Sequence, residues 1–453
     1  MKVVVVGGGI AGLTTAYDLA RGGAEVVLFE AADRAGGKIR TGPFAGLPNV
    51  DSGADAFLAR VPWAVELCHE LGFGDQLISP ASRHAYIYTR GALRPIPTPN
   101  VLGVPLDLDA LSASGIVSDD AVRIAARDLD RTVDAAMPED DESLGSLVRR
   151  RLGDEILEQL VDPLLGGIYA GDSDRLSLAA GAPLIDAAAR KNASLMRALD
   201  AQRQATLAAD PTAPVFFAPP NGMAQLVHAL EKALENLIVR DHPVTNITQD
   251  GRGWIVDSTR CDAVVIATPT PVTARLLQPV APRTAALVDA IEYAGVVLVT
   301  MAFARDAIGV PLDASGFLVP KPEAMMLTAC SWSSTKWAHL DRGDYAILRA
   351  SAGHFGNQRA LAMGDSALVA TMLDELGDAM HLHDEPVEVR VQRWPASFPQ
   401  YTPGHLARVD GIIAALTDEA PGIALIGAAY RGIGIPALVH AGRDAAAHIR
   451  SLL

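Results

Sequence analysis

The sequence predicts a mixed α/β fold that combines a Rossmann-like dinucleotide-binding unit, an antiparallel sheet and a helical insertion. The first observation behind this prediction is the stretch VVVVGGGIAG at residues 3–12, where an apolar strand runs into Gly-x-Gly-x-x-Gly and then into a helix. The second is a polar, helical pattern between residues 118 and 210. The third is a series of alternating strands between residues 294 and 410 that lack the spacing of βαβ units.

Each glycine of the first turn has a separate expected role. Gly7 allows the sharp turn, Gly9 lets the backbone approach a pyrophosphate, and Gly12 lets the helix pack closely on the strand. The phosphate then lies at the helix N-terminus. Residues 24–29 form a second strand, and Glu30 at its end can accept hydrogen bonds from a ribose. The alternative is a purely structural turn with a solvated Glu30.

Length, composition and charge limit the classes of protein that the chain can belong to. Its 453 residues, 49% of them hydrophobic and 20% charged, indicate a globular protein of about two to four domains. The net charge of −15 argues against nucleic acid as a partner. An anionic substrate would therefore need local cations.

The cysteines and histidines give no sign of a metal or disulfide framework. Cys68, Cys261 and Cys330 are far apart, which predicts a reduced, cytoplasmic protein. His381 and His383 are interpreted as solvated loop residues, so we expect no metal. We also expect no secretory signal and no transmembrane segment, while peripheral contact with a membrane stays open.

Two further glycine loops follow the second strand. In the first, the amides of Gly36 and Gly37 and the charge of Lys38 can reach phosphate oxygens. In the second, at residues 51–55, the backbone can pass close to a flat ligand. Read singly, each loop could equally be an ordinary surface turn.

The order of these pieces resembles a known family. Gly7-x-Gly9-x-x-Gly12, Glu30, Arg34-x-Gly36-Gly37-Lys38 and Asp51-x-Gly53-Ala54-Asp55 are similar to the N-terminal FAD signature of the amine oxidase and protoporphyrinogen oxidase superfamily. The resemblance implies a tightly held FAD. The residues that it implies at the cofactor are Gly7, Gly9, Ile10, Ala11, Gly12, Glu30, Gly36, Gly37, Lys38, Gly53, Ala54, Asp55, Val244, Thr268, Trp394, Gly427, Ile433, Gly434 and Ile435.

Two internal segments resemble the porphyrinogen oxidases within this superfamily. Residues 163–178 carry Gly166, Gly167 and Gly171 and are similar to the segment that lines the tetrapyrrole pocket, where glycines let a flat molecule approach the main chain. Without the resemblance, this segment is a helix-breaking loop. Residues 393–405 match the family as well. The chain departs from the family after Pro436, where Ala437 and Leu438 replace the usual Asp and Cys.

The resemblance also predicts a division into domains. The FAD-binding domain is expected to comprise residues 1–80, 211–270 and 411–453. The substrate-binding domain is expected to comprise residues 81–98 and 271–410, and residues 99–210 form the helical insertion.

The function implied by the resemblance is the oxidation of coproporphyrinogen III to coproporphyrin III in haem biosynthesis. Flavin N5 accepts hydride, three two-electron cycles complete the reaction, and dioxygen reoxidises the flavin to give hydrogen peroxide. Gly167 in the pocket and the cations Arg90, Arg94, Lys336 and Arg349 are the candidate catalytic residues. The cations would hold the substrate's propionates, although each could equally be a solvated surface cation.

Several other interpretations stay open. Protoporphyrinogen IX is the alternative substrate, and amines or carotenoids are further alternatives within the superfamily. A carrier that has lost its flavin and an NAD-dependent dehydrogenase are disfavoured, because the flavin-type glycine loops are retained and a second dinucleotide turn is missing. Contact with a ferrochelatase is left open.

Overall fold

The computed structural model describes most of the chain. The described ranges are residues 1–132, 140–210, 213–251 and 253–452. Outside them lie residues 133–139 of the predicted helical insertion, residues 211 and 212 at the expected start of an FAD-binding segment, and residues 252 and 453.

A five-stranded parallel sheet carries the glycine turn. Its strand order is β11-β2-β1-β15-β21, and every neighbouring pair is parallel. The strands are β1 (Lys2–Val6), β2 (Glu25–Phe29), β11 (Ile238–Val239), β15 (Ala263–Ile266) and β21 (Ile423–Leu425). Segments from both ends of the chain and from its middle therefore form one sheet, as the prediction of a Rossmann-like unit requires.

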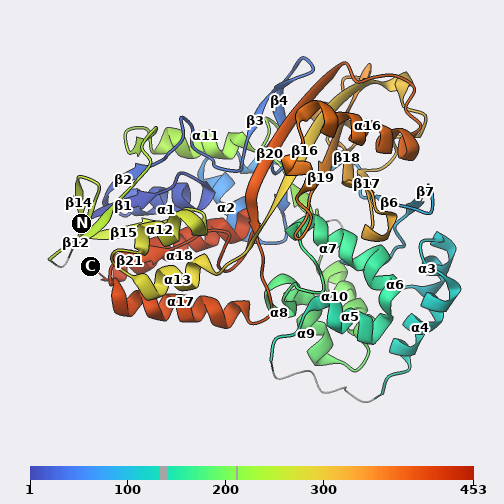
Figure 1. Ribbon diagram of the computed structural model, residues 1–453, viewed down its shortest axis with the longest axis horizontal. Coiled ribbons are helices and arrows are strands. Elements are labelled where there is room, and N and C mark those ends of the chain that lie inside the picture. Colours follow the sequence, from blue (N-terminus) through green and yellow to red (C-terminus); the bar gives the residue numbers. More distant parts are fainter. Residues whose placement is uncertain (133–139, 211–212, 252, 453) are drawn as a thin grey trace.

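Both faces of this sheet are covered (Figure 1). Val3 and Val5 of β1 face one apolar core, and Val4 and Val6 face another, so the strand is apolar throughout. The first core is built with the helices α1 (Ile10–Arg21), α2 (Pro62–Glu70), α11 (Ala224–Ala233) and α18 (Ile435–Leu452). The second is built with β12 (Ile247–Asp250), β13 (Gly253–Val256), β14 (Thr259–Cys261), α12 (Thr270–Leu277), α13 (Pro282–Asp289) and α17 (His405–Glu419).

A seven-stranded mixed sheet forms the second large layer. Its order is β20-β16-β19-β18-β17-β6-β7, and all neighbours are antiparallel except β17 and β6. The strands are β6 (Tyr86–Thr89), β7 (Ala92–Pro95), β16 (Tyr293–Ala304), β17 (Gly316–Leu318), β18 (Leu327–Trp332), β19 (Tyr345–Ala352) and β20 (Glu388–Pro399). Leu368, Met372 and Leu376 of α16 (Asp365–Met380) pack against this sheet. This layer confirms the strands predicted between residues 294 and 410, while the parallel pair β17 and β6 makes the sheet mixed where an antiparallel sheet is predicted.

The helices between residues 108 and 209 form a separate bundle below the seven-stranded sheet in the view of Figure 1. Its helices are α3 (Leu108–Ser114), α4 (Asp119–Leu129), α5 (Leu144–Leu152), α6 (Asp154–Ile156), α7 (Asp162–Tyr169), α8 (Leu178–Gly181), α9 (Pro183–Lys191) and α10 (Leu195–Ala209). Ser143 caps α5, with its hydroxyl accepting from the Ser146 N–H. Asp154 begins α6, whereas Gly153 is the cap.

The segment at residues 163–172 corrects one prediction. It was expected to interrupt the helices, but α7 runs through it as far as Tyr169. Pro163 lies in the first turn of α7, directly after a π-helical turn at Leu157–Val161, and Gly166 and Gly167 remain helical. The break comes only at Ala170, which has a φ of 46°.

Short elements complete the described chain. The strands are β3 (Thr41–Phe44), β4 (Leu47–Asp51), β5 (Phe57–Leu58), β8 (Asn100–Val101), β9 (Val104–Pro105) and β10 (Phe216–Phe217), and the short helices are α14 (Ser333–Lys336) and α15 (Arg359–Ala362). The 3₁₀ turns are η1 (Gly74–Gln76), η3 (Arg305–Ala307), η4 (Lys321–Glu323) and η5 (Ala338–Leu340), and η2 (Leu157–Val161) is a π-helical turn. Residues 243–246, which include Val244, lie outside any strand, and β12 begins only at Ile247. In the described parts of the chain, no helix has both the length and the apolar character needed to cross a membrane.

Candidate active site

The first glycine turn has the geometry that its spacing predicts. Gly7 has a φ of +105°, which favours glycine, and its N–H donates to the Phe29 carbonyl at 2.8 Å. A Cβ on Gly12 would lie 2.0 Å from the Gly7 oxygen, so only glycine fits there. A Cβ on Gly9 would meet no atom of the described residues within 4 Å. The space beside Gly9, at the N-terminus of α1, is therefore open.

Glu30 is fixed beside this turn. Its Oε2 accepts the Gly8 N–H at 2.7 Å, and its Oε1 accepts the Ala32 N–H at 2.8 Å. Each carboxylate oxygen keeps a further lone pair for a ligand hydroxyl. The carboxylate therefore stands at the carboxyl end of β2, next to the N-terminus of α1.

The second glycine loop lies directly on the first. The Gly36 N–H donates to the Gly8 carbonyl at 2.7 Å, and a Cβ on Gly37 would lie 3.4 Å from the Gly9 Cα. The Arg34 guanidinium holds the loop in shape by donating to the carbonyls of Ala35, Gly37 and Ile39. The two loops therefore present their backbones to the same space.

Lys38 lies differently from its expected position at a phosphate. Its Nζ donates to the Ser397 carbonyl near the end of β20. Burial lowers the pKa of Lys38 to about 8. In this structure Lys38 therefore joins the glycine loop to the seven-stranded sheet.

The loop at residues 51–55 is held by charges from the seven-stranded sheet and α14. Asp55 pairs with Lys336 at 2.9 Å and with Arg349 at 3.1 Å, and it accepts the Trp337 Nε1–H at 3.2 Å. Burial raises the pKa of Asp55, but these cations and hydrogen bonds outweigh burial and hold it well below the usual range. Arg349 also donates to the Gly53 carbonyl at 3.0 Å.

A second turn with open space precedes α18. Gly427 has a φ of +129°, and neither it nor Gly434 has a neighbour that would clash with a Cβ. The Tyr401 hydroxyl accepts the Gly432 N–H at 2.9 Å and donates to the Ala428 carbonyl at 2.5 Å. Since α18 packs on α1, with Ile10 and Ile435 in one core, both helices border the same part of the fold.

The other expected cofactor residues lie in different settings. Thr268 follows β15 and lies near Gly7, whose added Cβ would be 3.3 Å from the Thr268 methyl group. Val244 is buried with Phe29 in the second core. Trp394 donates from Nε1 to the Ser52 carbonyl at 2.9 Å, and Ala54 is exposed.

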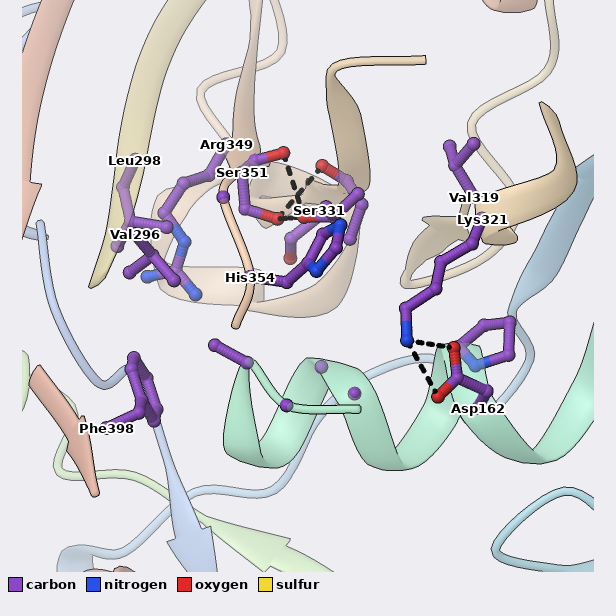
Figure 2. A pocket seen from close by; sticks show the side chains of 18 residues that line it. Asp162, Val296, Leu298, Val319, Lys321, Ser331, Arg349, Ser351, His354 and Phe398 are labelled. Atoms are coloured by element: carbon purple, nitrogen blue, oxygen red, sulfur yellow. Dashed lines mark hydrogen bonds and ion pairs between the residues drawn. The ribbon is translucent and has the colours of Figure 1, made fainter. Parts of the chain in front are cut away.

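A cavity of about 220 Å³ lies between α7 and the seven-stranded sheet. Figure 2 shows Val296 and Leu298 on one side, Phe398 at the edge, and Lys321 beside Asp162 at the other end. Gly166 and Gly167 of α7 expose backbone to the cavity. The walls are therefore mainly apolar, with charged groups at their ends.

The candidate catalytic residues are not all brought together. Gly167 and Arg349 line the cavity, whereas Arg90, Arg94 and Lys336 are not among its lining residues. Arg90 pairs with Glu155 at 2.8 Å, and Arg94 lies against Gly115. Lys336 is engaged with Asp55. These three cations lie outside the cavity, and each contacts a group that the fold places beside it.

The family model of the flavin containing amine oxidoreductases matches residues 10–450 of the chain. The chain belongs to this family. It is therefore a flavoenzyme, and FAD is its cofactor.

Within this family, the chain is similar to proteins named as porphyrinogen oxidases. Coproporphyrinogen III oxidase of Mycobacterium tuberculosis (strain ATCC 25618 / H37Rv) is 38% identical, covering 99% of this chain and 97% of that protein. The Bacillus subtilis (strain 168) protein of the same name is 30% identical, with coverage of 98% and 96%. The crystal structure of a protein assigned as a protoporphyrinogen oxidase, from Exiguobacterium sp. 255-15, has a TM-score of 0.88 at 30% identity, with coverage of 100% and 99%.

The glycine loops of this flavoenzyme fit an FAD. The Gly9 position leaves room for a pyrophosphate at the N-terminus of α1, where the first N–H groups have no helical partners and Gly9 supplies no side-chain cap. Glu30 stands where a ribose would be bound. The open turn at Gly427 and Gly434 leads into the N-terminus of α18, a second positive helix end.

Sequence reasoning missed two residues that line the cavity of this flavoenzyme, and it named a third, Arg34, only as part of the loop motif and without its role. Arg34 holds the second glycine loop, and Lys321 and His354 line the cavity. The sequence held a signal for Lys321 and His354. Each follows shortly after a predicted strand, and side chains at the ends of neighbouring strands come together at a sheet edge. Lys321 pairs with Asp162 at 3.1 Å and with Asp172 at 3.2 Å.

Proposed function

We propose that this flavoenzyme oxidises a porphyrinogen, with coproporphyrinogen III as the preferred substrate, in haem biosynthesis. The observation that carries the proposal is the apolar cavity between α7 and the seven-stranded sheet, which Arg349 links to the loop at residues 51–55. The names of the relatives from M. tuberculosis and B. subtilis support the choice of substrate.

The bound flavin supplies the chemistry, because it accepts the hydride of a meso carbon in each two-electron step. The chain's own residues bind and orient the macrocycle. The backbone at Gly166 and Gly167 admits a flat face, while Val296 and Leu298 exclude water from it. At about 220 Å³ the cavity is smaller than a tetrapyrrole needs, so the substrate's rim would extend through the mouth.

Charge at the cavity ends supports a substrate with carboxylates. Lys321 and Arg349 line the cavity and are the candidates to hold propionates. Both are already paired with aspartates, so a propionate would share or displace those partners. Coproporphyrinogen carries more propionates than protoporphyrinogen and would gain more from such contacts.

The remaining parts of the proposal complete the reaction and its setting. We propose dioxygen as the electron acceptor, hydrogen peroxide as its product and three flavin cycles per porphyrin. We also propose a cytoplasmic location. Peripheral membrane contact and docking of a ferrochelatase are compatible with this location.

Anaerobic mixing with each porphyrinogen tests the substrate. The flavin absorbance near 450 nm should bleach rapidly with coproporphyrinogen III and at least about tenfold more slowly with protoporphyrinogen IX, a difference of about 1.4 kcal/mol in barrier. Faster bleaching with protoporphyrinogen would make that the substrate. Slow bleaching with both would remove the proposal.

A pair of glycine variants tests the cavity. Gly167→Leu in α7 would fill the cavity without a Cβ clash, since the nearest atom is 4.0 Å away. Gly411→Leu in α17 is the matched control, because it is also an exposed helical glycine with open space around it. We expect Gly167→Leu to keep its FAD and lose bleaching by porphyrinogen, and Gly411→Leu to keep both. Normal bleaching by Gly167→Leu would refute this cavity as the substrate site.

A further inference from the structure

We propose that His354 is a catalytic residue that accepts the proton leaving a pyrrole N–H of the substrate. This inference rests on the proposed function, because it concerns the same cavity and the same reaction. It assigns a proton acceptor to a reaction in which hydride leaves carbon and a proton leaves nitrogen.

A tight turn after β19 carries His354. The His354 N–H donates to the Asn357 carbonyl at 3.2 Å, and the Asn357 N–H donates back to the His354 carbonyl at 2.9 Å. Gly353 and Gly356, with φ of +93° and +81°, allow the chain to reverse there. The turn therefore sets the backbone from which the imidazole projects.

The same turn is fastened to the end of α7. The Phe355 N–H donates to the Ala170 carbonyl at 2.7 Å, and the Arg175 guanidinium lies 4.5 Å from the centre of the Phe355 ring. His354 is thus held between the seven-stranded sheet and the helical bundle. Figure 2 shows its imidazole at the cavity, across from the glycine backbone of α7.

A backbone carbonyl selects the tautomer of the imidazole. His354 Nδ1 lies 2.8 Å from the Phe355 carbonyl oxygen, which can only accept a hydrogen bond. Nδ1 must therefore carry the proton, and in the neutral ring Nε2 is left as an acceptor. Within the described chain, no hydrogen bond to Nε2 is seen.

The other ionisable groups at the cavity are already engaged. Asp162 accepts from Lys321 and from the Ser173 N–H, and Lys321 is paired with both Asp162 and Asp172. Arg349 binds Asp55 and does not lose its proton at any ordinary pH. The lining residues of β16 and β18 are not ionisable. His354 is therefore the lining group that has an uncharged basic nitrogen available to accept a proton.

The proposed step balances. A pyrrole N–H bond breaks, its electron pair stays in the macrocycle to form a new double bond, and a meso carbon gives up hydride to the flavin. The proton forms a bond to His354 Nε2 and then passes to solvent, which returns the imidazole to its neutral form. Three cycles remove three hydrides and three protons in all. Because a porphyrin keeps two of the four pyrrole N–H groups, the fourth meso carbon passes one proton to a pyrrole nitrogen, which restores the third N–H that was lost.

His354→Asn tests the step, because an asparagine amide can still donate to the Phe355 carbonyl but leaves no basic nitrogen in the place of Nε2. His448→Asn on the exposed side of α18 is the control. We expect anaerobic flavin bleaching by coproporphyrinogen III to slow by about 100-fold or more in His354→Asn and to stay normal in His448→Asn. FAD content and binding of coproporphyrin III, followed by fluorescence, should be unchanged in both.

The pH profile separates proton transfer from positioning. In the parent protein the bleaching rate should rise with pH through one ionisation, because only neutral imidazole accepts a proton, and His354→Asn should lose that rise. Asp162, Lys321, Arg349 and Arg175, the charged groups packed around the turn, remain in both proteins. A retained rise, or a rate within threefold of the parent, would refute the role of His354. Failure of the parent protein to bleach with either porphyrinogen would instead refute the proposed function.

Discussion

Single glycines in the first turn differ in what they tolerate. Gly12 is closed to any side chain, because the Gly7 oxygen occupies the place of its Cβ. Gly9 is open, and its φ of −68° suits any residue. Gly12 is therefore needed for folding, whereas the open side of Gly9 faces the proposed pyrophosphate.

Gly9→Val should therefore yield a folded protein without its yellow colour. The valine side chain would occupy the space of the pyrophosphate, so we expect the FAD content per chain to fall by at least about tenfold. The ratio of absorbance near 450 nm to that at 280 nm measures this. Gly364→Val is the control, because Gly364 also precedes a helix in an extended conformation with open space around it. Full flavin loading of Gly9→Val would contradict the assignment.

The buried carboxyl group of Asp51 should make the stability of the protein depend on pH. Burial raises its pKa to about 6, although Thr41 and the Met223 N–H donate hydrogen bonds to it. A raised carboxyl pKa contributes stability below about pH 4, the unfolded value, and that contribution is lost as the pH rises through about 6. The parent protein should therefore lose stability relative to Asp51→Asn over this range.

Urea unfolding of both proteins between pH 4 and pH 8 measures the difference. Asp384→Asn, in an exposed loop, should follow the parent protein at every pH. An unchanged difference between the parent protein and Asp51→Asn at pH 4 and pH 8 would show that Asp51 does not titrate as proposed.

At the scale of elements, Tyr401 connects the end of β20 to the turn before α18. Its ring stacks on His405 of α17 with centroids 4.0 Å apart, and its hydroxyl bonds to Ala428 and Gly432. The side chain is 1% exposed, so water does not replace these bonds. The buried hydroxyl therefore helps to hold the turn at residues 427–434, together with the contact between His405 Nε2 and the Tyr430 carbonyl at 2.8 Å.

Tyr401→Phe should loosen that turn. Two backbone groups would lose their partner, which costs about 1–3 kcal/mol each when they stay buried. We expect a lower midpoint in urea unfolding and faster loss of FAD on dilution. Tyr345→Phe, at an exposed site on β19, should change neither. Equal FAD retention in both variants would mean that the turn does not help to hold the cofactor.

At the scale of the whole molecule, the proposed cofactor residues come from distant parts of the chain. The glycine loops lie near the N-terminus, Thr268 follows β15, and the last turn precedes α18. A ligand that contacts all of them adds further links between segments that already meet in the parallel sheet and in the core between α1 and α18. Binding to the folded state alone raises the free energy of unfolding.

Removal of FAD should therefore lower the stability of the entire protein. Returning FAD at 100 times its Kd should raise the free energy of unfolding by about 2.7 kcal/mol. Thermal unfolding of the apoprotein with increasing FAD measures this, and NAD is the control, because it offers a pyrophosphate and ribose without a flavin. Equal stabilisation by NAD and FAD would contradict a site specific for flavin.

Much of the fold and part of the candidate site could be predicted. The strand, glycine turn and helix at residues 2–21 depend on neighbouring residues, and their pattern predicts them directly. The strands of the seven-stranded sheet show period-two patterns in the same way. The helix through Gly166 and Gly167 was missed, because glycines favour a break unless the surrounding packing supports the helix. The predicted division into domains stays a prediction.

The sequence by itself determined the nucleotide-binding unit and the presence of a second sheet, because local periodicity and fixed glycine spacing encode them. The flavin family came from the resemblance of the glycine-loop motifs to known flavoproteins. Only the tertiary structure decided which charges meet. Asp55 and Lys336 are 281 positions apart, yet they form a partly buried ion pair, while Arg90 pairs with Glu155 and Lys38 donates to Ser397. His354 likewise reaches the cavity only because its turn is bonded to α7. Pairing between distant side chains follows from how the layers pack, and no local pattern along the chain records it.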